Sequence, residues 1–268
     1  MLVDTHCHLN HADFKQELDK LIEESRKGGV KRIISSGVNS PTNKEVLEIA
    51  KRFSDIVRAT AGIYPIDALG LGSDEAGLAR QVVPIDLEQE FEFIKQNKDN
   101  FIAIGECGLD YHWVKDKKEE MKRNFEKIIS FVEKIKKPIV IHSRKAEEDC
   151  INMLQSSSIK KVQLHCFWGR KSLVKRGADL GYYFSIPANA NRQQHFQMII
   201  NLANINQLLT ETDAPWLSPI PQTRNEPKNV IFAIREIAKI KKMTEEETIN
   251  NIWKNYQNFF DDRTIDRG

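Results

Sequence analysis

The chain opens with Met1-Leu2-Val3-Asp4-Thr5-His6-Cys7-His8, and this stretch sets a pattern that later segments repeat. Leu2 and Val3 favour a short buried β-strand, and alternate side chains of a strand lie on the same face. His6 and His8 are therefore expected to point the same way at the end of this strand. Imidazole is the commonest metal-binding side chain, so two converging imidazoles can hold a divalent cation that prefers nitrogen and oxygen ligands.

Further strand patterns follow the first one, and a helix pattern separates each from the next. The strands are expected over residues 32–37, 57–63, 101–105, 137–142, 162–165, 182–186 and 207–210. The helices are expected over residues 14–28, 40–53, 86–95, 118–135, 146–154, 172–180, 192–202 and 229–240. Ser40 before Pro41 is typical of an N-cap. Thr244 and Glu247 have capping-box spacing, which predicts one more helix through Phe260, packed on the outside.

Strict alternation of strands and helices requires a parallel sheet. Eight such units in 268 residues predict an α/β fold of the (β/α)₈ TIM-barrel type with an additional C-terminal helix. An open doubly wound sheet is the alternative, but no Gly-x-Gly-x-x-Gly or phosphate-loop pattern follows a predicted strand. Repeats and linkers are absent from the sequence, so residues 1–268 are expected to form one domain. Residues 67–84 lack periodicity and are expected to form a loop, either a substrate rim or surface decoration.

The composition is that of a globular protein, with 40% hydrophobic and 29% charged residues and a net charge of +2. This charge is too small to indicate nucleic-acid binding by itself. The sequence has neither a long apolar span nor a signal-peptide pattern, which predicts a cytoplasmic protein that does not enter membranes. Its four cysteines are widely spaced, so we expect reduced, packed thiols rather than metal ligands. The sequence indicates no obligate protein partner.

Histidines and carboxylates collect at the carboxyl ends of the predicted strands. In a parallel barrel these ends open on one face, which carries the active site. A lone buried histidine is usually a core residue, but several buried polar groups on one rim are costly unless they have partners. The candidate metal ligands are His6, His8, Glu106, His142, His165 and Asp213. The other strands end near Ser36, Tyr64 and Asn189, where we expect no ligand, and His11, His112 and His195 are expected at the surface or behind the ligands.

Six ligands exceed the need of one tetrahedral ion and fit two divalent ions that share Glu106. The first ion is expected on His6, His8, Glu106 and Asp213, and the second on Glu106, His142 and His165. Such ion pairs activate water for hydrolysis, which makes Glu106 and Asp213 the expected catalytic residues. Asp213 is the candidate for moving the proton of the water.

The loops that follow the ligand strands combine basic and aromatic residues. This combination suits an anionic substrate with bases that can stack. The expected substrate contacts in these loops are Arg144, Trp168, Trp216 and Arg224. The alternative is that these arginines only solvate the surface.

Six segments resemble the signature sequences of the TatD-related deoxyribonucleases. They are residues 3–9, 103–111, 138–144, 164–169, 211–217 and 224–227. The resemblance implies a metal-dependent TIM-barrel hydrolase that cleaves phosphodiester bonds in DNA, often as a 3′ to 5′ exonuclease. It implies that the six candidate residues are the metal ligands. It also implies Mg²⁺ as the usual ion, while Mn²⁺, Zn²⁺, Ni²⁺ and Co²⁺ suit such ligands too.

One segment departs from the family pattern. The family commonly has Gly-x-His-Pro-His where this chain has Gly62-Ile63-Tyr64-Pro65-Ile66. Tyr64 is expected to contact the substrate by donating a hydrogen bond to a phosphate. Because the ligand set does not distinguish phosphate from carbonyl, hydrolysis of an amide, lactone or nucleobase stays open, as does a non-catalytic metal-bound scaffold.

Overall fold

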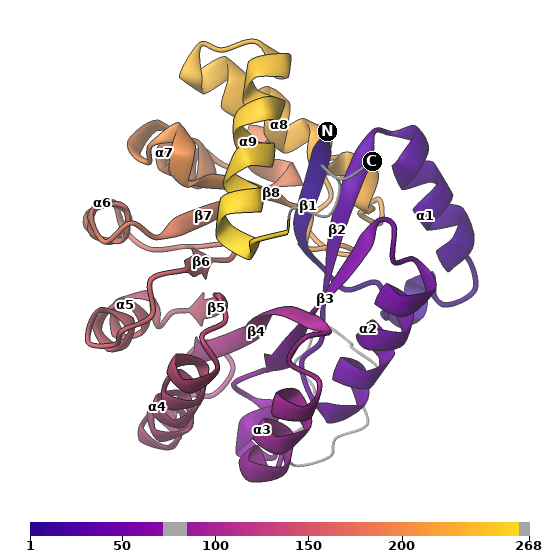
Figure 1. Cartoon of the computed structure of the whole chain (residues 1–268). Coiled ribbons are helices and arrows are strands. Elements are labelled where there is room, and N and C mark those ends of the chain that lie inside the picture. The colour runs from indigo at the N-terminus through magenta and orange to yellow at the C-terminus, as the bar shows by residue number, and fades with distance from the viewer. Residues whose placement is uncertain (72–84, 263–268) are drawn as a thin grey trace.

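The computed structural model describes residues 1–71 and 85–262, and its eight strands form one parallel sheet in the order β1 to β8 (Figure 1). The strands are β1 Leu2–Cys7, β2 Val30–Ser36, β3 Val57–Ile63, β4 Phe101–Asp110, β5 Ile139–Arg144, β6 Val162–Leu164, β7 Tyr183–Pro187 and β8 Leu208–Glu211. The helices are α1 Leu18–Lys27, α2 Ser40–Arg52, α3 Leu87–Gln96, α4 Lys118–Ile135, α5 Glu147–Gln155, α6 Lys171–Asp179, α7 Gln194–Leu202, α8 Val230–Lys241 and α9 Glu245–Phe260. The predicted eight-unit barrel with an additional C-terminal helix is confirmed.

The ring of strands closes where β8 returns to β1. The backbone N–H of Asp213 donates to the carbonyl of His6 over 2.9 Å, and the N–H of His8 donates to the carbonyl of Ala214 over 2.9 Å. Both hydrogen bonds join the carboxyl ends of these strands. The closure therefore places two predicted histidine ligands beside the predicted carboxylate ligand, although more than 200 residues separate them in the sequence.

Strand β4 is longer than the sequence predicted. We expected it to end at Gly105 with Glu106 just beyond, but the strand continues to Asp110. Between Ile104 and Cys107, β4 contains one residue more than the paired stretch of β5, which is a bulge. A bulge turns side chains away from the regular alternation. The extended strand therefore brings a second carboxylate, Asp110, to the open end of the barrel.

Two glycines allow β4 to lie this close to β5. Gly105 and Gly108 have φ angles of 145° and 142°, a region that residues with a side chain rarely adopt. A Cβ atom at Gly105 would lie 2.5 Å from the carbonyl oxygen of Val140, and one at Gly108 would lie 2.1 Å from that of His142. Side chains at these positions would push the two strands apart.

Helix α9 begins with the predicted capping box of Thr244 and Glu247. It packs on the outside of the strands, as predicted, but many of its side chains are buried, Phe259 completely. Asn255 donates a hydrogen bond over 2.8 Å to the carbonyl of Leu208, the first residue of β8. Figure 1 shows α9 running past β8. The helix therefore lies against the amino-terminal end of β8, away from the carboxyl ends of the strands.

Some predicted boundaries were wrong. Asn39, rather than Ser40, is the N-cap of α2, because its side chain accepts a hydrogen bond from the N–H of Thr42 over 3.2 Å. The helix expected over residues 14–28 is divided into a short 3₁₀ helix, Ala12–Phe14, and α1. In the loop expected over residues 67–84, Asp67–Leu69 forms a 3₁₀ helix, and residues 72–84 lie outside the described residues.

The helices within residues 1–71 and 85–262 were compared with the length and hydropathy that crossing a bilayer requires. None of them is long and apolar enough.

Candidate active site

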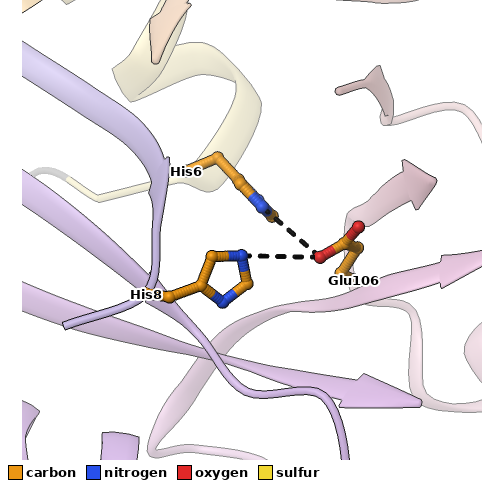
Figure 2. Close-up of side chains that lie close together, drawn as sticks. All are labelled: His6, His8 and Glu106. Carbon is orange, nitrogen blue, oxygen red and sulfur yellow. Dashed lines mark ion pairs between the residues drawn. The ribbon is translucent and has the colours of Figure 1, made fainter. Parts of the chain in front are cut away.

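The predicted ligands His6 and His8 meet Glu106 and Asp213 at the carboxyl end of the barrel. Their Nε2 atoms lie 3.5 and 3.6 Å from the same Oε2 atom of Glu106 (Figure 2). They lie 3.7 and 3.5 Å from Oδ1 of Asp213. Ligand atoms about 2.1 Å from one tetrahedral ion would be roughly 3.4 Å apart. The spacing of these four side chains therefore fits a small cation between them.

The burial of His6 adds a second observation in favour of a cation. Its side chain is fully buried, and within the described part of the chain its Nε2 atom has no hydrogen-bond partner. Buried polar atoms almost always have a partner, because burial without one costs free energy. An ion coordinated by Nε2 would remove this cost, so the residues present fit a metal.

The predicted ligands His142 and His165 face the other oxygen of Glu106. Nδ1 of His142 lies 2.6 Å from Oε1 of Glu106, and Nε2 of His165 lies 3.8 Å from the same atom. Within the described residues, the ligand atoms of Glu106, His142 and His165 lie close enough together to hold a metal ion. Those of His6, His8 and Glu106 form a second cluster of this kind. The two oxygens of one carboxylate thus serve two different pairs of histidines.

Ser36 orients the first two histidines. Nδ1 of His6 lies 3.1 Å from Ser36 Oγ, and Nδ1 of His8 lies 3.1 Å from the Ser36 carbonyl oxygen. Because these contacts occupy both Nδ1 atoms, both Nε2 atoms face the centre. From the sequence we expected no ligand at Ser36 and missed these contacts with the two histidines.

Two carboxylates lie behind the other two histidines, and sequence reasoning assigned neither of them a role. Glu211 is fully buried, lies 2.8 Å from Nδ1 of His165 and accepts the N–H of Cys166 over 2.9 Å. Asp110 is fully buried and lies 2.9 Å from Nε2 of His142. Their position in the sequence could have identified them, because each is an acidic residue close to a candidate ligand at the end of a strand.

The electrostatics of the centre keep its carboxylates ionised. Burial favours the neutral form of Glu106, but the hydrogen bond with His142 and the proximity of His6 and His165 outweigh it and hold its pKa well below the usual range. Burial likewise opposes ionisation of Asp213, but a hydrogen bond with His8 and the nearby histidines lower its pKa. Burial and the neighbouring His165 lower the pKa of His6, which favours the neutral, metal-binding imidazole.

The opposite shift affects the two histidines that have carboxylates behind them. Burial alone would lower the pKa of His142, but Asp110 and Glu106 raise it to about 9. Burial is also outweighed at His165, where Glu211 raises the pKa to about 10. The neighbouring carboxylates therefore stabilise a positive charge on both imidazoles.

A pocket of about 630 Å³ opens above the centre. Its walls include most of the predicted ligands and most of the predicted substrate contacts. The ligands are His8, Glu106, His142, His165 and Asp213, and the substrate contacts are Tyr64, Arg144, Trp168 and Trp216. His112 and Lys145 also line this pocket.

The rim residues have defined supports. The guanidinium of Arg144 lies 4.9 Å from the centre of the Trp113 ring. Trp168 is 47% exposed and stacks on His195, with the ring centres 4.7 Å apart and the planes at 16°. Trp216 packs edge-on against His8 with ring centres 5.3 Å apart. Of these aromatic side chains, Trp168 and Trp216 line the pocket, so they form part of the walls between which a substrate would approach the centre.

Arg224 does not line this pocket. Its guanidinium pairs with Glu17 and lies 3.0 Å from Glu226, and it covers the ring of Phe14 at 4.8 Å. The structure therefore does not bring it together with the other predicted substrate contacts. Cys166 also differs from expectation, because it lines the pocket instead of packing in the interior.

Comparison with known proteins identifies the relatives of this chain. The human protein named deoxyribonuclease TATDN3 is 32% identical over 263 residues, which cover 97% of this chain and 94% of the relative. The protein named uncharacterized metal-dependent hydrolase YabD of Bacillus subtilis is 31% identical over 268 residues, which cover 97% of this chain and 99% of the relative.

A solved structure shares the fold. The structure of YJJV, a TatD homolog from Escherichia coli, superposes with a TM-score of 0.85 at 21% identity and covers 97% of this chain and 98% of that one. The sequence profile described as TatD related DNase matches residues 3–261. This match spans nearly the whole chain and includes all the predicted ligands. The chain therefore belongs to the TatD-related DNase family of metal-dependent hydrolases.

Proposed function

We propose that this protein hydrolyses phosphodiester bonds in DNA, as an exonuclease, at a centre that holds two divalent ions. The observation that carries the proposal is the position of Glu106, whose Oε2 faces His6 and His8 while its Oε1 faces His142 and His165. A carboxylate placed in this way can bridge two ions. A single ion held by one of the described clusters would leave at least two of the four histidines without a ligand role.

In this proposal the first ion would be held by His6, His8, Glu106 and Asp213, and the second by Glu106, His142 and His165. Two divalent ions supply Lewis-acid chemistry, since they favour ionisation of a water and stabilise the charge of a phosphodiester under attack. Mg²⁺ is the expected ion, and Mn²⁺, Zn²⁺, Ni²⁺ or Co²⁺ can occupy the same nitrogen and oxygen ligands.

The carboxylate of Asp213 is proposed to accept a proton during the reaction. It lines the pocket and is one of the groups around the buried Nε2 of His6. Its low pKa keeps it ionised at neutral pH, so it is ready to act as a base. Glu106 shares its two oxygens between the histidine pairs, and its role is to hold the centre together.

The pocket walls support a nucleotide substrate. Arg144 and Lys145 provide positive charge for phosphate oxygens, and Trp168 and Trp216 provide aromatic faces for bases. The hydroxyl of Tyr64 reaches towards Asp110, 3.4 Å away, from the wall of the same pocket. The human relative is named as a deoxyribonuclease, which favours DNA over an amide or lactone as the substrate.

The test is cleavage of end-labelled single-stranded DNA by metal-stripped protein, with Mg²⁺, Mn²⁺ or Zn²⁺ added back. We expect cleavage only with metal and its loss in Glu106→Gln. Glu90→Gln is a matched control, because Glu90 is also a buried carboxylate, held 2.7 Å from Asn43, and does not line the pocket. The order of products from each labelled end reports the direction. Absence of cleavage with every metal, combined with turnover of an amide or lactone, would replace the proposal.

A single domain over residues 1–268, a cytoplasmic location and action without an obligate protein partner stay predictions from the sequence. A DNA or oligonucleotide substrate is the partner that the pocket supports.

A further inference from the structure

Asp110 is held in one orientation at the end of β4. Its Oδ1 atom accepts the backbone N–H groups of His112 and Trp113 over 2.9 and 3.0 Å. Its Oδ2 atom lies 2.9 Å from Nε2 of His142, and the hydroxyl of Tyr64 lies 3.4 Å from the same oxygen. The side chain is fully buried, so it cannot rotate into solvent. One oxygen is therefore fixed by the backbone, and the other is aimed at one nitrogen of one histidine.

His142 is turned the opposite way from the other three histidines of the centre. In His6, His8 and His165 the Nδ1 atom contacts an orienting group and Nε2 faces the carboxylate of Glu106. In His142 the Nε2 atom contacts Asp110, and Nδ1 faces Glu106. The two ring nitrogens have thus exchanged places in this histidine alone among the four.

Neighbouring residues hold the reversed ring in place. The ring of Tyr64 packs edge-on against His142, with ring centres 4.9 Å apart and planes at 66°. Gly108 pairs with His142 in the sheet, and its missing Cβ lets β4 carry Asp110 close to β5. The packing of Tyr64 and the pairing of β4 with β5 therefore fix the orientation of the His142 ring.

We infer that Asp110 is a positioning residue that makes His142 bind its metal through Nδ1, while His6, His8 and His165 bind through Nε2. Asp110 does this by accepting a hydrogen bond from Nε2–H, which leaves the lone pair of Nδ1 facing the centre. Hydrogen bonds to the non-coordinating nitrogen fix the tautomer of metal-binding histidines in this way. The inference rests on the metal centre of the proposed function.

Replacing Asp110 with asparagine reverses the hydrogen bonding without changing the shape. The two backbone N–H groups require an oxygen at the Oδ1 position, so the amide NH₂ of the substituted side chain must face His142. That NH₂ can only donate, so Nε2 becomes an acceptor and the proton moves to Nδ1, where it blocks coordination. We expect Asp110→Asn to raise the Kd of one of two Zn²⁺ or Co²⁺ ions by about 10- to 100-fold.

Metal binding is measured by isothermal titration calorimetry and by metal content after gel filtration. The matched control is Asp149→Asn, which changes a carboxylate that pairs with Tyr111 over 2.7 Å outside the centre. We expect this control to bind both ions with the affinity of the unchanged protein. Unchanged affinity for both ions in Asp110→Asn would overturn the inference. So would an equal loss at both sites, because Asp110 contacts only one of the four histidines.

A second measurement needs no variant at the positioning residue. In Zn²⁺-loaded protein, long-range ¹H–¹⁵N NMR spectra of the histidine rings report which nitrogen carries hydrogen. We expect Nε2–H for His142 and Nδ1–H for His6, His8 and His165, with the His142 signals assigned by their absence in His142→Gln. Observation of Nδ1–H for His142 would overturn the inference.

The two proposals fail differently. Protein that binds no divalent ion would refute the proposed function. Protein that binds two ions and cleaves DNA, but whose His142 binds through Nε2, would refute only the role of Asp110.

Discussion

Trp168 offers a direct test of the substrate side of the proposed function. Its indole is 47% exposed at the pocket, and His195 covers one face of the ring. The exposed part of the ring can stack on a base. Stacking of a base on an aromatic side chain is worth about 1–3 kcal/mol. Because about half of the side chain is exposed, we expect about 1.5–2 kcal/mol, or a 10- to 30-fold rise in KM, for Trp168→Ala.

The assay is steady-state cleavage of a single-stranded oligonucleotide at saturating Mg²⁺. We expect kcat to stay within about twofold, because the described ring contacts of Trp168 are with His195 and Phe196 rather than with a predicted ligand, so its effect is on binding. Trp168→Phe should keep most of the affinity, since an aromatic face remains. Ile220→Ala is the matched control, because Ile220 is 49% exposed but does not line the pocket. A fall in kcat at constant KM, or an equal effect of Ile220→Ala, would refute the reasoning.

Three further predictions concern stability and metal. Gly108→Ala should lower the free energy of unfolding by more than about 3 kcal/mol, because a strained φ angle is combined with a contact of 2.1 Å. Gly181→Ala, with φ of 78° and open space, should cost only about 1–2 kcal/mol, and urea denaturation compares the two variants. Removal of metal by a chelator should lower Tm, and added Zn²⁺ or Mn²⁺ should restore it in the unchanged protein but not in Glu106→Gln. Burial opposes ionisation of Asp149, but hydrogen bonds with Tyr111 and Lys122 outweigh it and lower the pKa of this carboxyl. The ionised carboxylate therefore stabilises the fold above about pH 4, and this stabilisation is lost as the pH falls through the lowered pKa. Urea unfolding of Asp149→Asn should accordingly show a weaker loss of stability on acidification than the unchanged protein.

Local sequence patterns predicted most of the architecture. The strand pattern over residues 57–63 and the helix pattern over residues 118–135 predicted β3 and α4 with their observed bounds, because strand and helix periodicity are properties of neighbouring residues. The prediction for β4 was too short. In the sequence, two glycines close together indicate a turn rather than a strand. Only the pairing of β4 with β5 shows that these glycines have positive φ and allow the two backbones to approach closely.

The residues of the candidate site likewise include some that the sequence predicted and some that it did not. His6, His8, Glu106, His142, His165 and Asp213 could be selected from the sequence, because each lies at the end of a predicted strand and all strand ends of a parallel barrel share one face. The structure brings all six together. The supporting groups Ser36, Asp110 and Glu211 could not be assigned, because an ordinary serine or carboxylate gives no sign of which nitrogen it will face.

The sequence by itself determined the alternation of strands and helices, the eight-unit barrel and the residues that its rim would carry. These follow from hydrophobic periodicity and from the rule that parallel strands end on one side. Only the tertiary structure decided which oxygen of Glu106 faces which histidines, that Arg224 turns away from the pocket, and that the ring of His142 is reversed towards Asp110. Those features depend on distances of a few ångströms between segments far apart in the chain, which no pattern of neighbouring residues encodes.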